Sequence, residues 1–244
     1  MSAIPTFFSV VIPAYNEVGR IAPTLRSIIA YMGRQSCPWE IIVVDDGSRD
    51  ETNRKVRDLL DSPANIRLIQ HRVNQGKGAA VRTGLLASRG TAVLFCDADG
   101  ATPIEELSRL LEGFGRGVPF VVGSRRVAGS QVVLQQSWYR RLMSDCYQGL
   151  CRLLLAPGVS DITCGFKLLS REAVDLIAPR MRVNGWSFDA EMFTIARIHR
   201  IKVKEIPVRW AHQQRTKVQL ARDTWISFIE LLQILIYAAR GTYR

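Results

Sequence analysis

Short, fully apolar segments alternate with amphipathic ones over the first half of this chain. Strands are predicted at the apolar runs, residues 9–13, 40–44, 66–70, 91–96 and 120–123. The stretches between them have helical spacing, and two begin at capping boxes, where Ser48 precedes Glu51 and Thr102 precedes Glu105. Strands that are apolar on both faces must be covered on both sides. The pattern therefore predicts an α/β fold with a mostly parallel central sheet flanked by helices.

The second half of the chain is less regular, but it contains no repeat, low-complexity tract or linker. Helices are predicted at 137–155, 171–178, 188–200 and 222–240, with extended segments at 161–169 and 202–207. The chain has 244 residues, which is long enough for one large domain with its own core. We therefore expect a single domain over residues 1–244.

The last predicted helix is apolar from residue 225 to 239 except for Ser227, Glu230 and Gln233. At ~1.5 Å per residue this stretch is shorter than the ~30 Å hydrocarbon core of a bilayer, and a carboxylate inside it disfavours a membrane span. Three arrangements remain open: the helix packs on the domain, lies on a membrane surface or pairs with another chain.

Polar and glycine-containing loops follow four of the predicted strands. They lie at residues 13–17, 45–48, 74–78 and 97–102. In open α/β sheets, ligands bind beyond the carboxyl ends of the parallel strands. We therefore expect one crevice to collect all four loops.

The loop after the fourth strand carries two carboxylates, Asp97 and Asp99. Carboxylates two residues apart at a strand end can point into the same crevice, and hard oxygen ligands suit Mg²⁺ or Mn²⁺ bound together with substrate phosphates. The alternative is a polar turn in which Asp99 caps the next helix. Because Thr102 already supplies that cap, we favour a site for a metal-bound diphosphate.

The loop after the second strand carries two further acids, Asp45 and Asp46. A carboxylate here can accept hydrogen bonds from a nucleobase or a ribose. An ordinary turn explains Gly47 and Ser48, as a residue with positive φ and an N-cap, but it does not require two adjacent acids.

The remaining two loops carry weaker signals. Residues 74–78 read Asn-Gln-Gly-Lys-Gly, which can cradle a phosphate, but the stretch is neither a Walker A sequence nor a full GxGxxG fingerprint because Val81 holds the last glycine position. Tyr15 follows the first strand and can either stack on a base or cover the edge of the sheet.

The charge of the chain is distributed unevenly. The formal net charge is +11, yet residues 1–115 carry 13 basic and 13 acidic side chains, so the whole excess lies in residues 116–244. A general compositional bias would spread the excess evenly. Of the 33 basic residues 27 are Arg, whose planar guanidinium grips phosphate oxygens in pairs. The second half is therefore expected to meet a polyanion: nucleic acid, a phosphorylated substrate or an anionic membrane face.

Cysteines and targeting signals add little. The five cysteines are an odd number and form no CxxC pair, so the sequence indicates neither a zinc site nor a disulfide framework. The first residues lack the basic and apolar regions of a signal peptide, and a reducing compartment is expected.

Taken together and in order, the motifs VIPAYNE, VVDDGS, NQGKG and DADG resemble those of inverting glycosyltransferases that use nucleotide-sugar donors. The resemblance extends through the second half, to residues 123–125, 138–141, 161–167, 186–191 and 216–217. Over about residues 8–240 the chain resembles the dolichyl-phosphate sugar synthases, most closely their glucosyltransferase branch, with the mannose synthases as near relatives. Two departures are expected: no N-terminal membrane span, and a loop that usually reads Ser-Lys reads Arg215-Thr216-Lys217.

The resemblance implies a Rossmann-like glycosyltransferase A-type fold with a donor half at 1–115, an acceptor half at 116–221 and an amphipathic helix at 222–240. It implies donor binding by Pro13, Ala14, Tyr15, Glu17, Asp45, Asp46, Lys77, Asp97 and Lys217. It implies Mg²⁺ or Mn²⁺ at Asp97 and Asp99. The acceptor phosphate would contact Arg125, Arg140, Arg141, Ser144 and Arg215. The sugar pocket would be lined by Asp189, which can equally cap its helix, and Glu191. The catalytic residues would be Asp97, Asp99 and Arg125.

The expected reaction is the metal-dependent, inverting transfer of a hexose, with glucose favoured, from a nucleotide sugar such as UDP-glucose to a polyprenyl or dolichyl phosphate. A hydroxyl acceptor requires a carboxylate base, whereas a lipid phosphate is already anionic and requires cations, which an Arg-rich half supplies. The alternatives are a GDP-mannose-dependent mannosyltransferase and transfer to a soluble or polysaccharide hydroxyl.

The expected location is peripheral, at the anionic cytosolic face of a membrane, with a homodimer or a separate membrane-anchoring subunit as further partners. Nucleic acid is not expected as a partner, because the acidic motifs lie in the crevice. A catalytically inactive scaffold is disfavoured because Asp97 and Asp99 are both present.

Overall fold

A computed structural model describes residues 5–60, 65–134, 138–211 and 220–244. In the first half of the chain the elements are, in order, β1 (Phe8–Ala14), α1 (Ile21–Met32), β2 (Trp39–Asp45), α2 (Thr52–Leu60), β3 (Ile66–Gln70), α3 (Lys77–Ala87), β4 (Ala92–Cys96), η1 (Ile104–Glu106), α4 (Leu107–Gly115) and β5 (Phe120–Ser124). The predicted alternation of strands and helices is confirmed.

The second half contains β6 (Gln131–Leu134), α5 (Trp138–Leu154), β7 (Phe166–Ser170), α6 (Arg171–Ile177), η2 (Ala178–Arg180), α7 (Phe188–Ile198), β8 (Val203–Pro207), β9 (Arg209–Ala211) and α8 (Leu220–Ala239). The short parallel pair of β6 and β9 was not predicted from the sequence. Neither strand has the length or the alternation that makes a strand visible in a sequence.

The central sheet has the strand order β3-β2-β1-β4-β7-β5-β8. The pairs β1–β2, β1–β4, β2–β3 and β5–β8 are parallel, and β7 runs antiparallel to both of its neighbours. The predicted mostly parallel sheet is therefore confirmed. The reversed strand β7 within the sheet was not predicted from the sequence.

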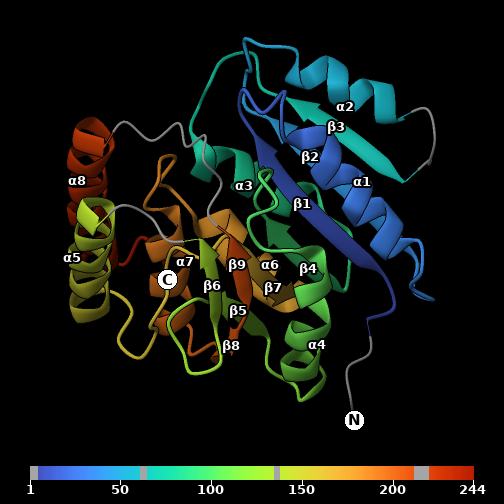
Figure 1. Cartoon of the computed structure of the whole chain (residues 1–244). Helices are drawn as coiled ribbons and strands as arrows, with labels where there is room; N and C mark the ends of the chain where they lie inside the picture. Colours follow the sequence, from blue (N-terminus) through green and yellow to red (C-terminus); the bar gives the residue numbers. More distant parts are fainter. Residues whose placement is uncertain (1–4, 61–64, 135–137, 212–219) are drawn as a thin grey trace.

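Helices cover both faces of this sheet (Figure 1). Side chains alternate across β1, so that Val10 and Ile12 pack toward α1 and α4, whereas Val11 packs toward α3, α6 and α7. All seven residues of β1 are buried, as the apolar run predicted. The carboxyl ends of the strands remain open between these two layers.

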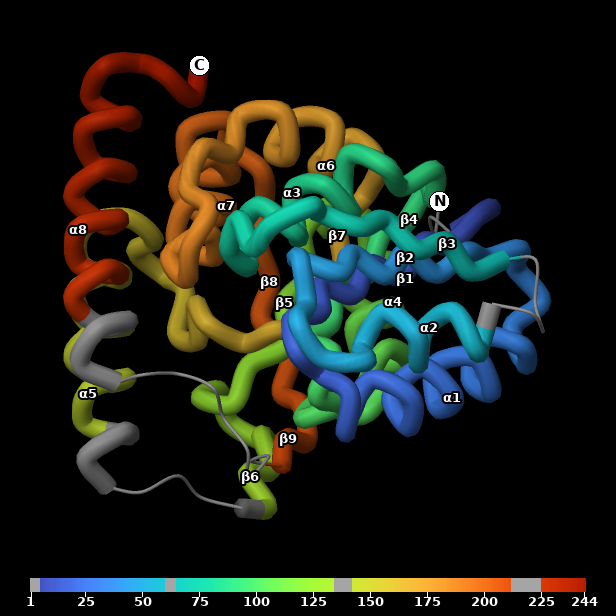
Figure 2. Tube along the Cα trace, turned by 90° about the horizontal axis from the view of Figure 1, so that it is seen from above, coloured from blue at the N-terminus to red at the C-terminus, as the bar shows by residue number. Residues whose placement is uncertain are grey.

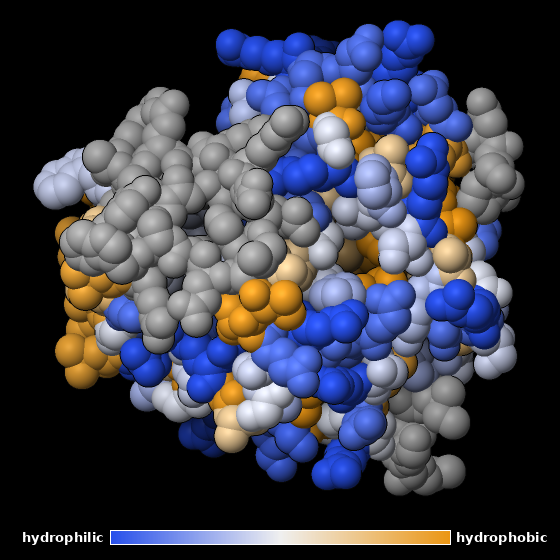
Figure 3. Space-filling model, viewed as in Figure 1, coloured by the Kyte–Doolittle hydropathy of each residue, from blue (hydrophilic) through white to orange (hydrophobic). Residues whose placement is uncertain are grey.

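Helices α5 and α8 lie side by side, outside α7 (Figures 1 and 2). The inner face of α8 is buried and carries Ser227, Glu230, Leu231 and Ile234. Its outer face exposes Trp225, Ile229, Leu232 and Ile236, and hydrophobic residues gather at this edge of the molecule (Figure 3). Of the three arrangements left open for this helix, packing on the domain is thus observed for its inner face. No helix in the described part of the chain is both long and apolar enough to cross a membrane.

Candidate functional site

The loops that the sequence analysis assigned to one crevice meet at one edge of the sheet. The in-register pairing of β1 with β2 and β4 brings residues 14–17, 45–48 and 97–101 together. Because β7 is antiparallel, it begins where the parallel strands end, and Phe166 pairs with Cys96. The segment before β7 therefore joins the loops that follow β1, β2 and β4.

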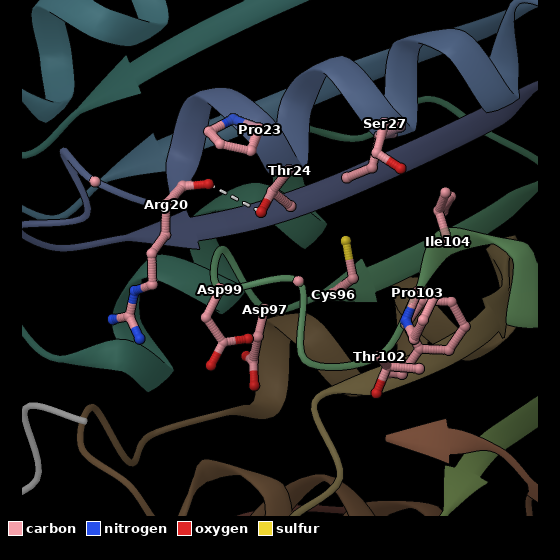
Figure 4. Close-up of a pocket in the computed structure, with 14 residues that line it drawn as sticks. Arg20, Pro23, Thr24, Ser27, Cys96, Asp97, Asp99, Thr102, Pro103 and Ile104 are labelled. Atoms are coloured by element: carbon pink, nitrogen blue, oxygen red, sulfur yellow. Dashed lines mark hydrogen bonds between the residues drawn. The ribbon is translucent and has the colours of Figure 1, made fainter. Parts of the chain in front are cut away.

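Asp97 and Asp99 lie side by side with their carboxylates pointing the same way, and Arg20 extends beside them (Figure 4). They line a cavity of about 380 Å³ between α1 and residues 96–104. The Ala101 N–H donates a 3.0 Å hydrogen bond to Asp99 Oδ1. Burial, and next the negative charge of Asp97, raise the pKa of Asp99. Two carboxylates that repel each other in a partly buried cavity would be stabilised by a cation.

The backbone leaves room for the Asp97 carboxylate at Gly165. The Asp97 N–H donates to the Gly165 carbonyl at 3.1 Å, and a Cβ atom on Gly165 would lie 2.0 Å from Asp97 Oδ2. No group of three or more His, Cys, Asp or Glu side chains is arranged to hold a metal among the described residues. A pair of carboxylates nevertheless fits Mg²⁺ or Mn²⁺, which take one or two protein carboxylates and complete their shell with water and substrate phosphates.

Lys77, the first residue of α3, lies beside the carboxylate pair. Its Nζ is 2.7 Å from Asp97 Oδ1 and 5.5 Å from the centre of the Trp186 ring. Burial alone would lower the pKa of Lys77, but the acidic neighbours, led by Asp97 and Asp189, outweigh it and raise the pKa. The ammonium group is therefore held charged next to the carboxylates, which is where a donor diphosphate would need a cation.

A second buried ion pair lies behind Lys77. Lys167 is fully buried in β7, and its Nζ lies 2.6 Å from Asp189 Oδ1 and 2.5 Å from the Cys164 carbonyl oxygen. Burial raises the pKa of Asp189, and Lys167 opposes that shift. Asp189, which was predicted to line the sugar pocket or to cap its helix, thus forms an ion pair. Lys167 was not predicted as a site residue, although a lysine between the apolar residues of a buried strand was a signal.

Asp46 organises the loop before α3. Its Oδ1 lies 2.7 Å from His71 Nδ1 and accepts a 2.9 Å hydrogen bond from the Gln75 N–H. Its Oδ2 accepts 2.8 Å hydrogen bonds from Asn74 Nδ2 and the Gly76 N–H. Both oxygens are therefore occupied by the protein's own groups. The predicted contact between Asp46 and a nucleoside does not agree with this arrangement.

Asp45 is also fully buried, and it accepts hydrogen bonds from the Ser48 N–H at 3.1 Å and from Asn53 Nδ2 at 3.3 Å. It therefore holds the turn that leads to α2. Next to it lies a second cavity, of about 490 Å³, formed by residues 47–49 and 70–74. This cavity, and not a free Asp45 carboxylate, offers space for a ligand beside the ends of β2 and β3.

The loop after β1 is hydrogen-bonded to the loop after β2 and to the start of α2. Pro13 and Ala14 are buried at the end of the strand, and Tyr15 is half-buried in the loop. The Glu17 N–H donates a 2.6 Å hydrogen bond to Thr52 Oγ1, and the Glu17 carboxylate pairs with Arg20 at 2.6 Å. Glu17 therefore orients Arg20, a residue of the cavity wall that the sequence analysis did not select.

Arg125, predicted to bind the acceptor phosphate, is held by a buried partner. Its Nε and Nη2 atoms donate 2.7 Å hydrogen bonds to the two carboxylate oxygens of Asp161, and Nη2 also donates to Thr163 Oγ1 at 3.0 Å. Burial would raise the pKa of Asp161, but Arg125 outweighs it and lowers the pKa. The guanidinium also lies over the Trp210 ring at 5.2 Å. The structure gives Arg125 a structural role that the sequence analysis did not anticipate.

Glu191, predicted to line the sugar pocket, faces the end of the chain. Its carboxylate accepts hydrogen bonds from the Tyr243 hydroxyl at 2.7 Å and from the N–H groups of Arg182 and Val183 at 2.8 and 3.0 Å. The side chain is fully buried. We therefore correct the prediction: Glu191 anchors the C-terminal segment and is not open to a sugar.

The remaining predicted acceptor residues are not assembled into a site by the described residues. Ser144 lies on α5, where its Oγ accepts a 3.1 Å hydrogen bond from Gln148. Arg140 and Arg141 belong to the same helix, but their side chains lie outside the described part of the structure. Arg215 and Lys217 lie wholly outside the described residues.

Comparison with known proteins gives consistent matches. A family model described as glycosyl transferase family 2 matches residues 9–177. The chain is 36% identical, over 98% of its length, to a dolichyl-phosphate beta-glucosyltransferase of Trichomonas vaginalis, of which it covers 76%. It is 33% identical to the enzyme of that name in Saccharomyces cerevisiae, over 98% of this chain and 77% of the relative. The corresponding human protein is 33% identical over 86% of this chain and 69% of the relative.

Among solved structures, the fold is similar to that of glucosyl-3-phosphoglycerate synthase from Mycobacterium tuberculosis. The complex of that enzyme with UDP aligns with a TM-score of 0.70 at 21% identity, covering 94% of this chain and 80% of the other. Its complex with Mn²⁺, UDP-glucose and phosphoglyceric acid aligns with a TM-score of 0.69 over the same shares. At this level of identity the similarity concerns the fold, which is that of glycosyltransferases with an A-type fold.

Proposed function

The chain belongs to glycosyl transferase family 2, and on that basis we propose that it transfers glucose from UDP-glucose to a dolichyl or related polyprenyl phosphate. The observation that carries this proposal is the pair Asp97 and Asp99 at the end of β4, with Lys77 2.7 Å from Asp97. Two carboxylates can bind a metal and a lysine can bind a phosphate. Together these groups can stabilise the negative charge of a departing nucleoside diphosphate. In-line attack on an α-linked donor would give a β-linked lipid-phosphate sugar.

We infer a dependence on Mg²⁺ or Mn²⁺, which Asp97 and Asp99 would hold. When bound, such a metal stabilises the negative charge that develops on the leaving diphosphate. Lys77 adds a fixed positive charge on the side of α3. Arg20, held by Glu17, adds another on the side of α1. The protein thus provides cations on both flanks of the carboxylate pair.

The charges around Lys77 favour a phosphate acceptor over a hydroxyl. A hydroxyl must lose a proton to a carboxylate base during attack, whereas a phosphate is already ionised. Asp189, the buried carboxylate behind Lys77, is paired with Lys167 at 2.6 Å, and Asp97 and Asp99 serve the metal. Asp189 Oδ1 already accepts a hydrogen bond from Lys167, so this carboxylate is engaged within the protein, which supports an anionic nucleophile that needs no base.

The direct test compares UDP-glucose with GDP-mannose as donors to a short polyprenyl phosphate, with Mn²⁺ and with EDTA. We expect transfer from UDP-glucose to be at least about tenfold faster than transfer from GDP-mannose, because contacts with the nucleobase also stabilise the transition state. We expect EDTA to stop the transfer, because the metal stabilises the diphosphate as it leaves. Faster transfer from GDP-mannose would identify a mannosyltransferase. Faster transfer to a sugar or polysaccharide hydroxyl would overturn the proposed acceptor.

We further propose that the enzyme docks on the cytosolic face of a membrane through α5 and α8. Trp225, Ile229, Leu232 and Ile236 recur every three to four residues on the outer face of α8, and α5 beside it exposes Leu142, Met143, Leu153 and Leu154. A stripe of this kind suits an interfacial helix. The excess of +11 in residues 116–244 complements an anionic surface, and a lipid acceptor requires the enzyme to work there.

Docking can be tested by comparing variants of α8 that carry a new negative charge on this apolar stripe with a variant that carries one beside it. The double change Leu232→Glu with Ile236→Glu is expected to weaken binding to anionic vesicles at least about tenfold, because burial of each such side chain contributes about 1.5 kcal/mol or more. Gln233→Glu, which adds a charge beside the stripe, is the matched control and should change binding by less than about threefold. Equal binding of the double variant and the control in a flotation assay would point to a separate anchoring subunit or a second copy.

A further inference from the structure

Residues 183–187 are packed tightly against the start of α3, the helix that begins with Lys77. The N–H groups of Gly78 and Ala79 donate 3.2 Å hydrogen bonds to the carbonyls of Gly185 and Asn184. A Cβ atom on Gly78 would lie 2.5 Å from the Val183 carbonyl oxygen. Two of the four orphan donors at the helix start are thus satisfied by this segment. The position of Lys77 therefore depends on the position of residues 183–187.

The other side of the same segment is attached to α8. The Ser187 N–H donates a 2.9 Å hydrogen bond to Glu230 Oε2, and Ser187 Oγ donates a 3.1 Å hydrogen bond to the Ser227 carbonyl. A Cβ atom on Gly185 would lie 2.0 Å from Glu230 Oε1, so the backbone and the carboxylate are in close contact. Ser187 is fully buried and joins α8 to the loop.

The segment also places Trp186 over the site. The Trp186 ring centre lies 5.5 Å from Lys77 Nζ, and that ammonium group lies 2.7 Å from Asp97 Oδ1. Glu230 is not among the residues that line the cavity beside Asp97 and Asp99. It is the one acidic side chain between residues 225 and 239, and a buried carboxylate in an apolar stretch is costly unless it accepts hydrogen bonds.

We propose that Glu230 is a positioning residue for the transfer reaction. Its carboxylate holds residues 183–187 against α3 and thereby keeps Lys77 and Trp186 in place beside Asp97. The inference rests on the proposed function in one respect, namely that Lys77 serves the donor diphosphate. It adds that α8, whose outer face meets the membrane in that proposal, supports the donor side of the site through its inner face.

The test compares Glu230→Ala with Glu230→Gln and with Ile234→Ala. A glutamine oxygen can still accept the Ser187 N–H, whereas alanine leaves it unpaired. Ile234 is fully buried one turn further along α8, so its truncation loosens the helix without removing this hydrogen bond. Two quantities are measured: amide hydrogen exchange at residues 76–80, and the affinity for UDP with Mn²⁺ by calorimetry.

We expect Glu230→Ala to speed exchange at residues 76–80 and to weaken UDP binding, each by about tenfold, the usual size for loss of a hydrogen bond to a charged group. Glu230→Gln should stay within about threefold of wild type. Ile234→Ala should lower Tm while leaving UDP affinity unchanged. Should Glu230→Ala not fold, Glu230→Asp, with a side chain one carbon shorter, takes its place in the comparison.

Unchanged exchange at residues 76–80 in Glu230→Ala would overturn the proposal. So would a loss of UDP affinity in Ile234→Ala as large as that in Glu230→Ala, because the effect would then follow stability and not position. Neither measurement requires a lipid acceptor. Failure to glucosylate polyprenyl phosphate would therefore refute the proposed function while leaving the role of Glu230 intact.

Discussion

Replacing Asp99 with alanine is expected to slow transfer at least about 10³-fold while the protein stays folded, because the leaving diphosphate loses its metal. The described contacts of the Asp99 side chain include one backbone donor, the Ala101 N–H at 3.0 Å. Burial, and next the charge of Asp97, raise the pKa of Asp99, so its negative charge is unfavourable in this cavity. Removal of the carboxylate thus relieves repulsion, and the free energy of unfolding should not fall. Initial rates with UDP-glucose over a Mn²⁺ titration measure the first effect, and thermal unfolding measures the second.

Asp58→Ala is a suitable control, because Asp58 is an exposed carboxylate on α2, away from the cavity. It should leave the metal dependence and the rate unchanged within about twofold. If Asp99→Ala retained full Mn²⁺-dependent activity, the assignment of Asp99 to the metal would be wrong. A large drop in Tm would instead reveal a structural role that its contacts do not indicate.

The second large effect is on stability: Asp161→Asn is expected to lower the free energy of unfolding by about 3–5 kcal/mol, because it leaves the Arg125 charge without its buried partner. Arg125 donates two 2.7 Å hydrogen bonds to a carboxylate that is fully buried. The lowered pKa of Asp161 gives a second signature. The contribution of the Arg125–Asp161 pair to stability is complete above the ordinary carboxyl pKa. It is lost as pH falls through the lowered pKa that Asp161 has in the folded protein. Urea unfolding at neutral and acid pH should therefore show a difference between wild type and variant that shrinks in acid.

The pair of Arg126 with Asp145 provides the matched comparison, since both of its side chains are partly exposed. Asp145→Asn should cost less than about 1 kcal/mol, the usual limit for surface ion pairs. Equal losses in the two variants would show that the pair of Arg125 with Asp161 is not the stabilising feature proposed. The pair of Arg125 with Asp161 also affects the interpretation of an Arg125→Ala variant. A loss of acceptor use in that variant would combine any phosphate contact with the loss of a structural bond.

The architecture was largely predictable because its strands are short apolar runs whose neighbours have helical spacing. Val10, Val11 and Ile12 are buried on both faces of β1. An unbroken apolar run of this kind therefore indicates a sheet that is covered on both faces. The direction of β7 was not predictable in this way. Its partners Cys96 and Val122 are distant in the sequence, and an apolar strand has the same composition in either direction.

The carboxylate pair was predictable for the same reason, since Asp97 and Asp99 directly follow a buried strand. The roles of Asp46, Glu191 and Glu230 were not predictable. Their partners include backbone N–H groups of loops, such as those of Gly76, Val183 and Ser187, and no spacing pattern reveals such donors. An acid that binds a loop and an acid that binds a ligand look alike in a sequence.

The reversed strand β7 also bears on how the chain reaches its fold during synthesis. Strands β1 to β4 can pair with one another as soon as residues 8–96 are made, but β4 then has an open edge until residues 166–170 emerge and β7 pairs with it. That edge is fully apolar, AVLFC, and unpaired apolar edges are sites of intermolecular association. A ribosome that pauses between β4 and β7 would leave this apolar edge exposed to other chains. The rate of translation between the two strands therefore affects the yield of native protein.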